Sequence, residues 1–338
     1  MNPSFVSTSI EPSPRTGFKK IAPALVLFFL SPFVAEFLLG NISISALGAL
    51  VFLAPMYGGG AVVIREIARR FNRGWPTIIL LALAYGLLEE GIFIQTLFNP
   101  HYMGFSLLTE AYMPSLGMGG WWTLFVLTLH TVWSISVPIA ITEGLFPKRR
   151  ETPWLGKMGL TVFVILYIIG DLMIRGGTSH QDHFTAMPTQ LISVAIAVLV
   201  IVVIAFQLKK GSPMVSGSVP KPILVGGFTF LVGLAFMSAH AVLHAWIIVS
   251  VYCAIYVVGF GLLSFWSHRE SWSPLHTLAA GGGAMLTYAC TAFPQVPVIG
   301  AKGTVDLIGN SIFAVVAVWL LIAATKRQRH ALAASAIG

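Results

Sequence analysis

Residues 188–210 read PTQLISVAIAVLVIVVIAFQLKK, and this stretch decides the fold class. It contains no charged residue between Pro188 and Leu208, and two lysines follow directly. A helix needs about 20 such residues to cross the hydrocarbon core of a bilayer. We therefore predict a transmembrane helix over residues 188–208, with Lys209 and Lys210 at the headgroups.

The same pattern recurs along the whole chain. Of its 338 residues, 56% are hydrophobic and 9% are charged, whereas soluble domains carry about 25% charged residues. The sequence predicts an all-α, polytopic bundle in the lipid bilayer of the cell membrane, with one multi-pass domain over 20–326. A disordered cytoplasmic tail at 1–19 and a short cytoplasmic tail at 327–338 flank it. About ten spans are predicted, at 21–40, 43–64, 76–98, 120–146, 158–175, 188–208, 222–242, 246–266, 274–292 and 304–325.

Basic residues fix the predicted orientation. With the N-terminus in the cytoplasm, 18 of the 20 Lys and Arg residues fall in cytoplasmic segments, and only Arg175 and Lys302 fall outside. Both termini are therefore predicted to be cytoplasmic. The net charge of +8 comes from these short clusters rather than from a basic stripe, so no nucleic-acid partner is expected.

Two adjacent carboxylates, Glu89 and Glu90, fall inside the third predicted span. An ionisable residue within a span indicates function by default. Like charges so close do not both ionise easily, so the pair is suited to holding and exchanging a proton. His130, on the fourth span, is expected at the same depth in the outer half of the membrane. The alternative is that these residues have no catalytic role. The glutamate pair would then contribute only to helix packing, and His130 would only form a hydrogen bond with one glutamate.

Other polar residues have less specific interpretations. His240 and His244 are spaced i, i+4 and could share a metal such as zinc if the segment is helical, but the turn between the seventh and eighth spans is also expected near residues 238–246. Structural histidines are an equal alternative there. We interpret Arg65, Arg69 and Arg70 as an anchor at the inner headgroups. Glu143 is expected to pair with Lys148 or Arg149, Asp171 with Arg175, and Glu36 and Asp306 lie near outer helix ends without an assigned partner.

The Glu89–Glu90 doublet followed by His130 resembles the CAAX protease and bacteriocin-processing (CPBP, or Abi) family of intramembrane proteases. The family motifs run Glu-Glu-x-x-x-Arg, Phe-x-x-x-His and His-x-x-x-Asn/Asp. The resemblance implies that one glutamate and the histidines activate a water, with His240 as the second histidine and His244 at the Asn position. Ile94 stands at the Arg position, and Phe125 precedes His130 by five residues. Segment 85–134 carries the resemblance.

Three functions remain open at this stage. The first is a membrane-embedded hydrolase, an intramembrane glutamate-type endopeptidase acting on a membrane-associated peptide or protein, with Glu89, Glu90, His130, His240 and His244 at its site. The second is a proton-coupled secondary transporter with Glu89 and Glu90 as proton carriers, in which Gly58–Gly60 and Gly281–Gly283 break helices or allow close packing. The third is a non-catalytic membrane assembly or immunity factor. Convergence of a glutamate, His130 and His240 on one point is the structural requirement of the peptidase.

Overall fold

The computed structural model describes residues 18–208 and 215–337, which form an all-α bundle. This confirms the predicted fold class. The loop before α4 contains a small antiparallel hairpin, whose strands β1 (Tyr112–Met113) and β2 (Met118–Gly119) have two residues each. The helices are α1 Phe18–Pro32, α2 Ala49–Arg70, α3 Trp75–Leu88, α4 Gly120–Thr128, α5 Val137–Leu145, α6 Lys157–Asp182, α7 Pro188–Gln207, α8 Pro222–Ala239, α9 Ala245–Ser267, α10 Pro274–Thr291 and α11 Thr304–Ile337.

Short helical segments complete these elements. Three π-helical segments occur within residues 18–208 and 215–337: Phe33–Phe37 continues α1, Glu89–Phe93 continues α3, and Leu129–Ser136 joins α4 to α5 into one long span. Single 3₁₀ turns occupy Ile44–Ala46, Tyr102–Gly104 and Pro147–Arg149. Of the disordered tail predicted at 1–19, residues 1–17 lie outside the described residues. Helix α1 begins at Phe18 and includes the last two. At the other end α11 runs through most of the predicted tail.

Nine helices within the described part of the chain are long and apolar enough to cross a membrane. They coincide with nine of the ten predicted spans. The tenth prediction, 274–292, corresponds to α10, which is as long as α8 but includes His276 and the glycines 281–283. Because α10 packs between α8, α5 and α11, protein rather than lipid covers most of it. An interior helix needs less hydrophobicity than one that faces lipid.

Outer and inner helices differ in what their apolar side chains face. The spans that contain α6, α7, α8 and α9 bury 11–22% of their residues, whereas those that contain α1, α2, α3 and α4–α5 bury 56–61%. Exposed leucine, isoleucine and valine side chains cover α7, as expected for a surface that contacts lipid. The second group forms the core of the bundle, and it carries most of the buried acidic and basic residues; Asp171 on α6, His276 on α10 and Asp306 on α11 are buried as well.

Close helix packing in the core depends on glycine. A β-carbon at Gly58 would lie 1.9 Å from the carbonyl oxygen of Phe28 on α1, and one at Gly283 would lie 2.0 Å from that of Gly226 on α8. The helices α2 and α10 run unbroken through both glycine triplets. The triplets therefore allow close packing, one of the two roles expected from the sequence.

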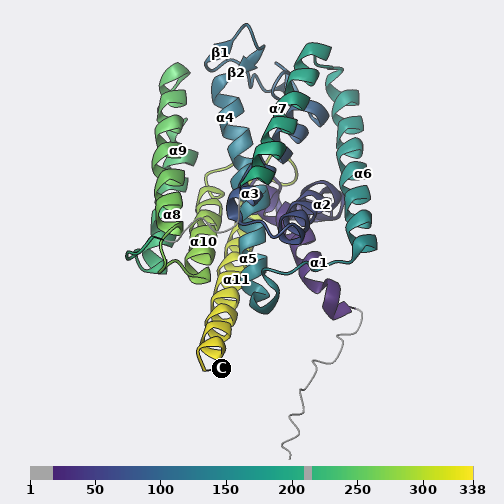
Figure 1. The fold of residues 1–338 in the computed structure, drawn as a ribbon. Helices are drawn as coiled ribbons and strands as arrows, with labels where there is room; N and C mark the ends of the chain where they lie inside the picture. Colours follow the sequence, from purple (N-terminus) through teal and green to yellow (C-terminus); the bar gives the residue numbers. More distant parts are fainter. Residues whose placement is uncertain (1–17, 209–214, 338) are drawn as a thin grey trace, which may run out of the picture.

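Loops predicted to share a side of the membrane lie together. Ile42, after α1, bridges Ile299, before α11, and Val215 bridges Arg269, so each pair of loops meets at one end of the bundle. Figure 1 shows the start of α1 and the end of α11 at the end of the bundle opposite the β1–β2 hairpin. Both ends of the described chain therefore lie on one side, as the charge pattern predicts.

Two predicted helix ends are corrected. The span predicted over 76–98 ends its helix at Phe93, and residues 94–99 continue as a buried irregular segment. The span predicted over 222–242 ends at Ala239, so His240 and His244 lie in a turn rather than on a helix. Irregular backbone at membrane depth is tolerated where protein covers it, as at residues 94–99.

Candidate functional site

Each π-helical segment carries a candidate functional residue. Glu36 lies in the first, Glu89 and Glu90 in the second, and His130 in the third. A π-helical turn leaves the regular hydrogen-bond pattern of an α-helix and is frequently found at functional sites. The three segments come together in the core of the bundle, which brings residues from positions far apart in the sequence into contact.

The centre of the site is a trio of Glu89, His130 and Glu90. His130 Nδ1 lies 3.0 Å from Glu89 Oε2, and His130 Nε2 lies 2.8 Å from Glu90 Oε1. The three residues are 0–5% exposed. Their possible ligand atoms lie within 4.8 Å of one another, so they could also hold a metal ion. The predicted proximity of the doublet and His130 is thus present in the structure.

The two glutamates differ in how their oxygens are held. Glu90 Oε2 accepts a hydrogen bond from the hydroxyl of Thr96, and Trp122 Nε1 donates to that hydroxyl at 2.9 Å. Glu90 Oε1 contacts His130, so both of its oxygens are engaged. Glu89 Oε2 lies 3.0 Å from His130 Nδ1 and the carboxylate is also close to the Tyr85 hydroxyl, but neither oxygen of Glu89 meets full hydrogen-bond geometry within the described residues. Glu90 is therefore fixed in place, whereas Glu89 is held less firmly.

A third glutamate joins the site from α1. Glu36 Oε1 accepts a hydrogen bond from the Tyr57 hydroxyl at 2.5 Å, and its Oε2 accepts one from Asn41 Nδ2 at 2.6 Å. The Tyr57 ring stacks on His130, with centroids 5.9 Å apart. The sequence left Glu36 unassigned, and no spacing rule links Tyr57 to a histidine on another helix.

Hydroxyl and carboxyl groups extend the site toward α6. The Tyr85 ring lies between His130 and Tyr167, with centroid distances of 5.9 and 5.7 Å. The hydroxyls of Tyr85 and Tyr167 and both oxygens of Asp171 are buried. The Tyr85 hydroxyl is close to the Glu89 carboxylate, and the Tyr167 hydroxyl is close to the Asp171 carboxylate. Asp171 was expected to pair with Arg175, but Arg175 Nη2 donates to Thr185. The i, i+4 spacings of Tyr85 with Glu89 and of Tyr167 with Asp171 are the sequence signal that could have found these tyrosines.

The structure does not bring His240 or His244 to the trio. His240 stacks on Trp121 at a centroid distance of 3.8 Å, and both histidines group with Glu110. Trp121 precedes His130 by nine residues on one continuous span, which corresponds to about 13 Å along the axis. The five predicted site residues therefore form two separate clusters, and the convergence of His240 with the trio, which a peptidase of the CPBP type requires, is not present.

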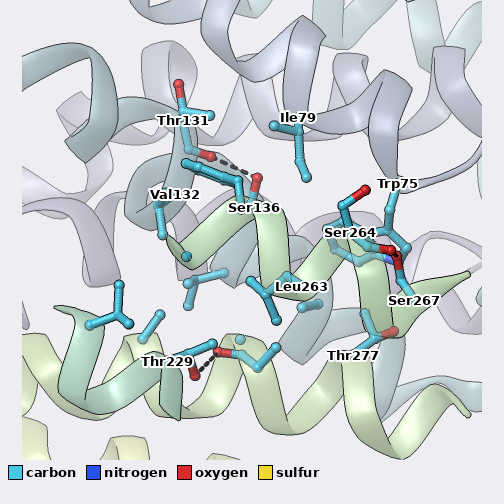
Figure 2. Close-up of a pocket in the computed structure, with 18 of the residues that line it drawn as sticks. Trp75, Ile79, Thr131, Val132, Ser136, Thr229, Leu263, Ser264, Ser267 and Thr277 are labelled. Atoms are coloured by element: carbon cyan, nitrogen blue, oxygen red, sulfur yellow. Dashed lines mark hydrogen bonds between the residues drawn. The ribbon is translucent and has the colours of Figure 1, made fainter. Parts of the chain in front are cut away.

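A cavity of about 580 Å³ lies beside the site, between α3, the α4–α5 span, α8, α9 and α10. Its lining is mainly apolar. Figure 2 shows that hydroxyl groups in the lining are hydrogen-bonded to neighbouring residues, so they add little polarity to the cavity. Ser136 donates to the backbone oxygen of Thr131 at 2.7 Å, and Thr229 donates to that of Ala280 at 2.9 Å. None of Glu89, Glu90 and His130 lines this cavity, but Thr131, the next residue after His130, does. The cavity suits an apolar chain.

Comparison with known proteins gives a family but no activity. No curated protein and no solved structure matches the chain. The resemblance to the CPBP family therefore gains no support beyond the Glu89–Glu90 doublet and His130. Together with the nine span-capable helices, the family match identifies a multi-pass membrane protein. The model of an uncharacterized membrane protein family matches residues 25–335, and the chain belongs to that family.

Proposed function

We propose that this protein is a membrane-embedded hydrolase in which Glu89 activates a water molecule. The observation that carries the proposal is the contact of His130 with a carboxylate at each of its ring nitrogens, in a buried site. In many acid–base catalysts one reacting side chain contacts a second titratable side chain, and a third group orients the second one. Glu89, His130 and Glu90 supply these three parts.

The different surroundings of the two glutamates suggest their roles. Glu89, which contacts His130 through Oε2 and is held less firmly than Glu90, would take a proton from water as the oxygen attacks a carbonyl carbon. Glu90, which Thr96 fixes, would orient His130 and so act as a positioning residue. As the bond to the leaving group breaks, His130 or protonated Glu89 would return the proton to that group.

A hydrolase also needs a donor for the oxyanion that forms on the carbonyl. The resemblance to the CPBP family implies a second histidine at the site, which the trio lacks. The Tyr85 hydroxyl is the donor that the geometry favours, because it is buried and belongs to a ring beside His130. The cavity lined by Thr131 would accept the apolar part of a lipid-modified or transmembrane substrate.

The test compares products in membranes. Wild-type and Glu89→Gln protein are each reconstituted with lipid and membrane protein extracted from the same cells, and mass spectrometry records new peptide termini and released acyl groups. We expect products with the wild type and a reduction of at least about 100-fold in Glu89→Gln, since a general base contributes about 10²–10⁴. Glu151→Gln, at an exposed site, is the matched control. Equal product profiles for wild type and Glu89→Gln would refute the hydrolase.

Proton-coupled transport is a second candidate, favoured by the series of buried hydroxyl and carboxyl groups that leads from Glu89 through Tyr85 and Tyr167 to Asp171. Such a series could pass protons between α3 and α6. In liposomes with an internal pH dye, a transporter gives substrate-dependent proton flux that Asp171→Asn abolishes. A hydrolase gives product but no flux, so the two functions are distinguishable in one preparation.

A further inference from the structure

A second polar cluster lies at the end of the bundle that carries the β1–β2 hairpin. It joins the turn between α8 and α9 to the loop that precedes α4. His240 and His244 come from the turn, and Glu110 comes from the loop. The cluster is separate from the Glu89–His130–Glu90 trio and has no part in the proposed hydrolysis.

The three side chains present their ligand atoms to one point. Those atoms all lie within 4.8 Å of one another. His244 Nδ1 lies 3.3 Å from Glu110 Oε1, and the two imidazole rings meet edge to face with centroids 5.4 Å apart. Ligand atoms about 2.0–2.2 Å from zinc in tetrahedral geometry are about 3.3–3.6 Å apart, so the 3.3 Å contact between His244 and Glu110 is at the lower end of the spacing of a ligand pair.

Neighbouring groups hold two of the ligands in position. The backbone N–H of Ala245 donates to Glu110 Oε2 at 2.5 Å, which leaves Oε1 directed at His244. Trp121 stacks on His240 and fixes the plane of its ring. Metal-binding side chains are commonly oriented by such outer contacts.

His240 points to a ligand more directly. Its Nε2 is buried and has no hydrogen-bond partner within the described residues. A buried polar atom without a partner is costly, and a metal ion would satisfy it.

We propose that Glu110, His240 and His244 form a binding site for a divalent transition-metal ion, with zinc as the best fit. Two imidazoles and one carboxylate are a ligand set that zinc uses with a fourth position left for water. Nitrogen ligands favour zinc over magnesium and calcium, which prefer oxygen. The ion would tie the α8–α9 turn to the loop before α4.

The experiment uses the full-length protein, stripped of metal with a chelator and titrated with zinc. We expect one zinc per chain by calorimetry and elemental analysis, and at least tenfold weaker binding in His240→Ala and in His244→Ala. Because the His244 side chain is 61% exposed, its replacement leaves the fold intact and keeps the test valid if His240→Ala misfolds. Magnesium at the same concentration is expected not to compete.

Two controls locate the site. His101→Ala removes an exposed histidine from the same outer loop and should leave zinc affinity unchanged. His130→Gln removes the only histidine of the trio and should also leave it unchanged, which separates this site from the proposed catalytic one. The proposal is overturned if the wild type binds no zinc, if His244→Ala binds as well as the wild type, or if binding is lost in His130→Gln.

Discussion

Replacing Glu143 by alanine is expected to lower the free energy of unfolding by about 3–5 kcal/mol, because it leaves buried Arg69 without its counterion and Arg65 with only one of its two. Glu143 accepts hydrogen bonds from Arg65 Nε at 3.0 Å and from Arg69 Nη2 at 2.7 Å. The three residues are 0–7% exposed. Their contacts join α2 to α5 at the end of the bundle where the chain begins.

The rest of the network cannot compensate for this loss. Arg65 is held by Glu66 at 2.9 Å, by the backbone oxygens of residues 149, 150 and 152, and by the Trp154 ring. Glu66 is itself committed to the backbone N–H groups of Trp154 and Leu155. Arg65 therefore stays buried when Glu143 is removed, and its Nε loses its acceptor.

The measurement is unfolding of the detergent-solubilised protein, by temperature or by titration with a denaturing detergent. Glu151→Ala is the matched control, because Glu151 pairs with Arg150 at 3.2 Å on the surface, where a salt bridge contributes at most about 1 kcal/mol. Glu143→Gln should fall between the two, since it keeps the side-chain volume but not the charge. Equal losses in Glu143→Ala and Glu151→Ala would contradict the buried network.

Gly283→Ala is expected to cost about 1–3 kcal/mol or more, which is the effect of overpacking a close contact. The added β-carbon would lie 2.0 Å from the Gly226 carbonyl oxygen and 2.3 Å from Thr229 Oγ1. The first obstacle is backbone, so α8 and α10 must separate rather than a side chain rotate.

Gly261→Ala on α9 is the control, and it is expected to leave the free energy of unfolding unchanged or to raise it slightly. A β-carbon there meets nothing within 4 Å. Alanine favours a helix interior by about 0.5–1 kcal/mol relative to glycine, so this variant should be as stable as the wild type or slightly more stable. The same unfolding measurement applies. A loss in Gly261→Ala as large as that in Gly283→Ala would show that the α8–α10 contact is not the cause.

The sequence predicted the fold well because lipid imposes a simple requirement of length and apolarity on each span. The failures have physical reasons. Arg65 and Arg69 were interpreted as an anchor at the headgroups, which is wrong, because they are buried against Glu143. The expected pairing of Glu143 with Lys148 or Arg149 is replaced by these contacts. The prediction chose basic residues close to Glu143 in the sequence, whereas its actual partners, Arg65 and Arg69, lie more than 70 residues away.

The site was predictable in part. Adjacent glutamates and a histidine at equal depth on consecutive spans could be brought together from the sequence. His240 could not be placed, because a turn and a helix fit residues 238–246 equally well. Glu36 lacked a partner by spacing, and its partner Tyr57 lies on another helix. Contacts between helices depend on rotation about their axes, which hydropathy does not determine.

The π-helical segments also affect how this chain should be compared with its relatives. A π-turn holds one more residue than an α-turn, so it advances the following side chains by about 100°. Residues before and after Leu129–Ser136 in the span over 120–145 therefore do not follow one regular α-helical register. A relative with a regular α-helix at His130 would align only with a single-residue gap inside a transmembrane helix. An alignment that forbids gaps there would place Trp121 or His130 opposite the wrong residue.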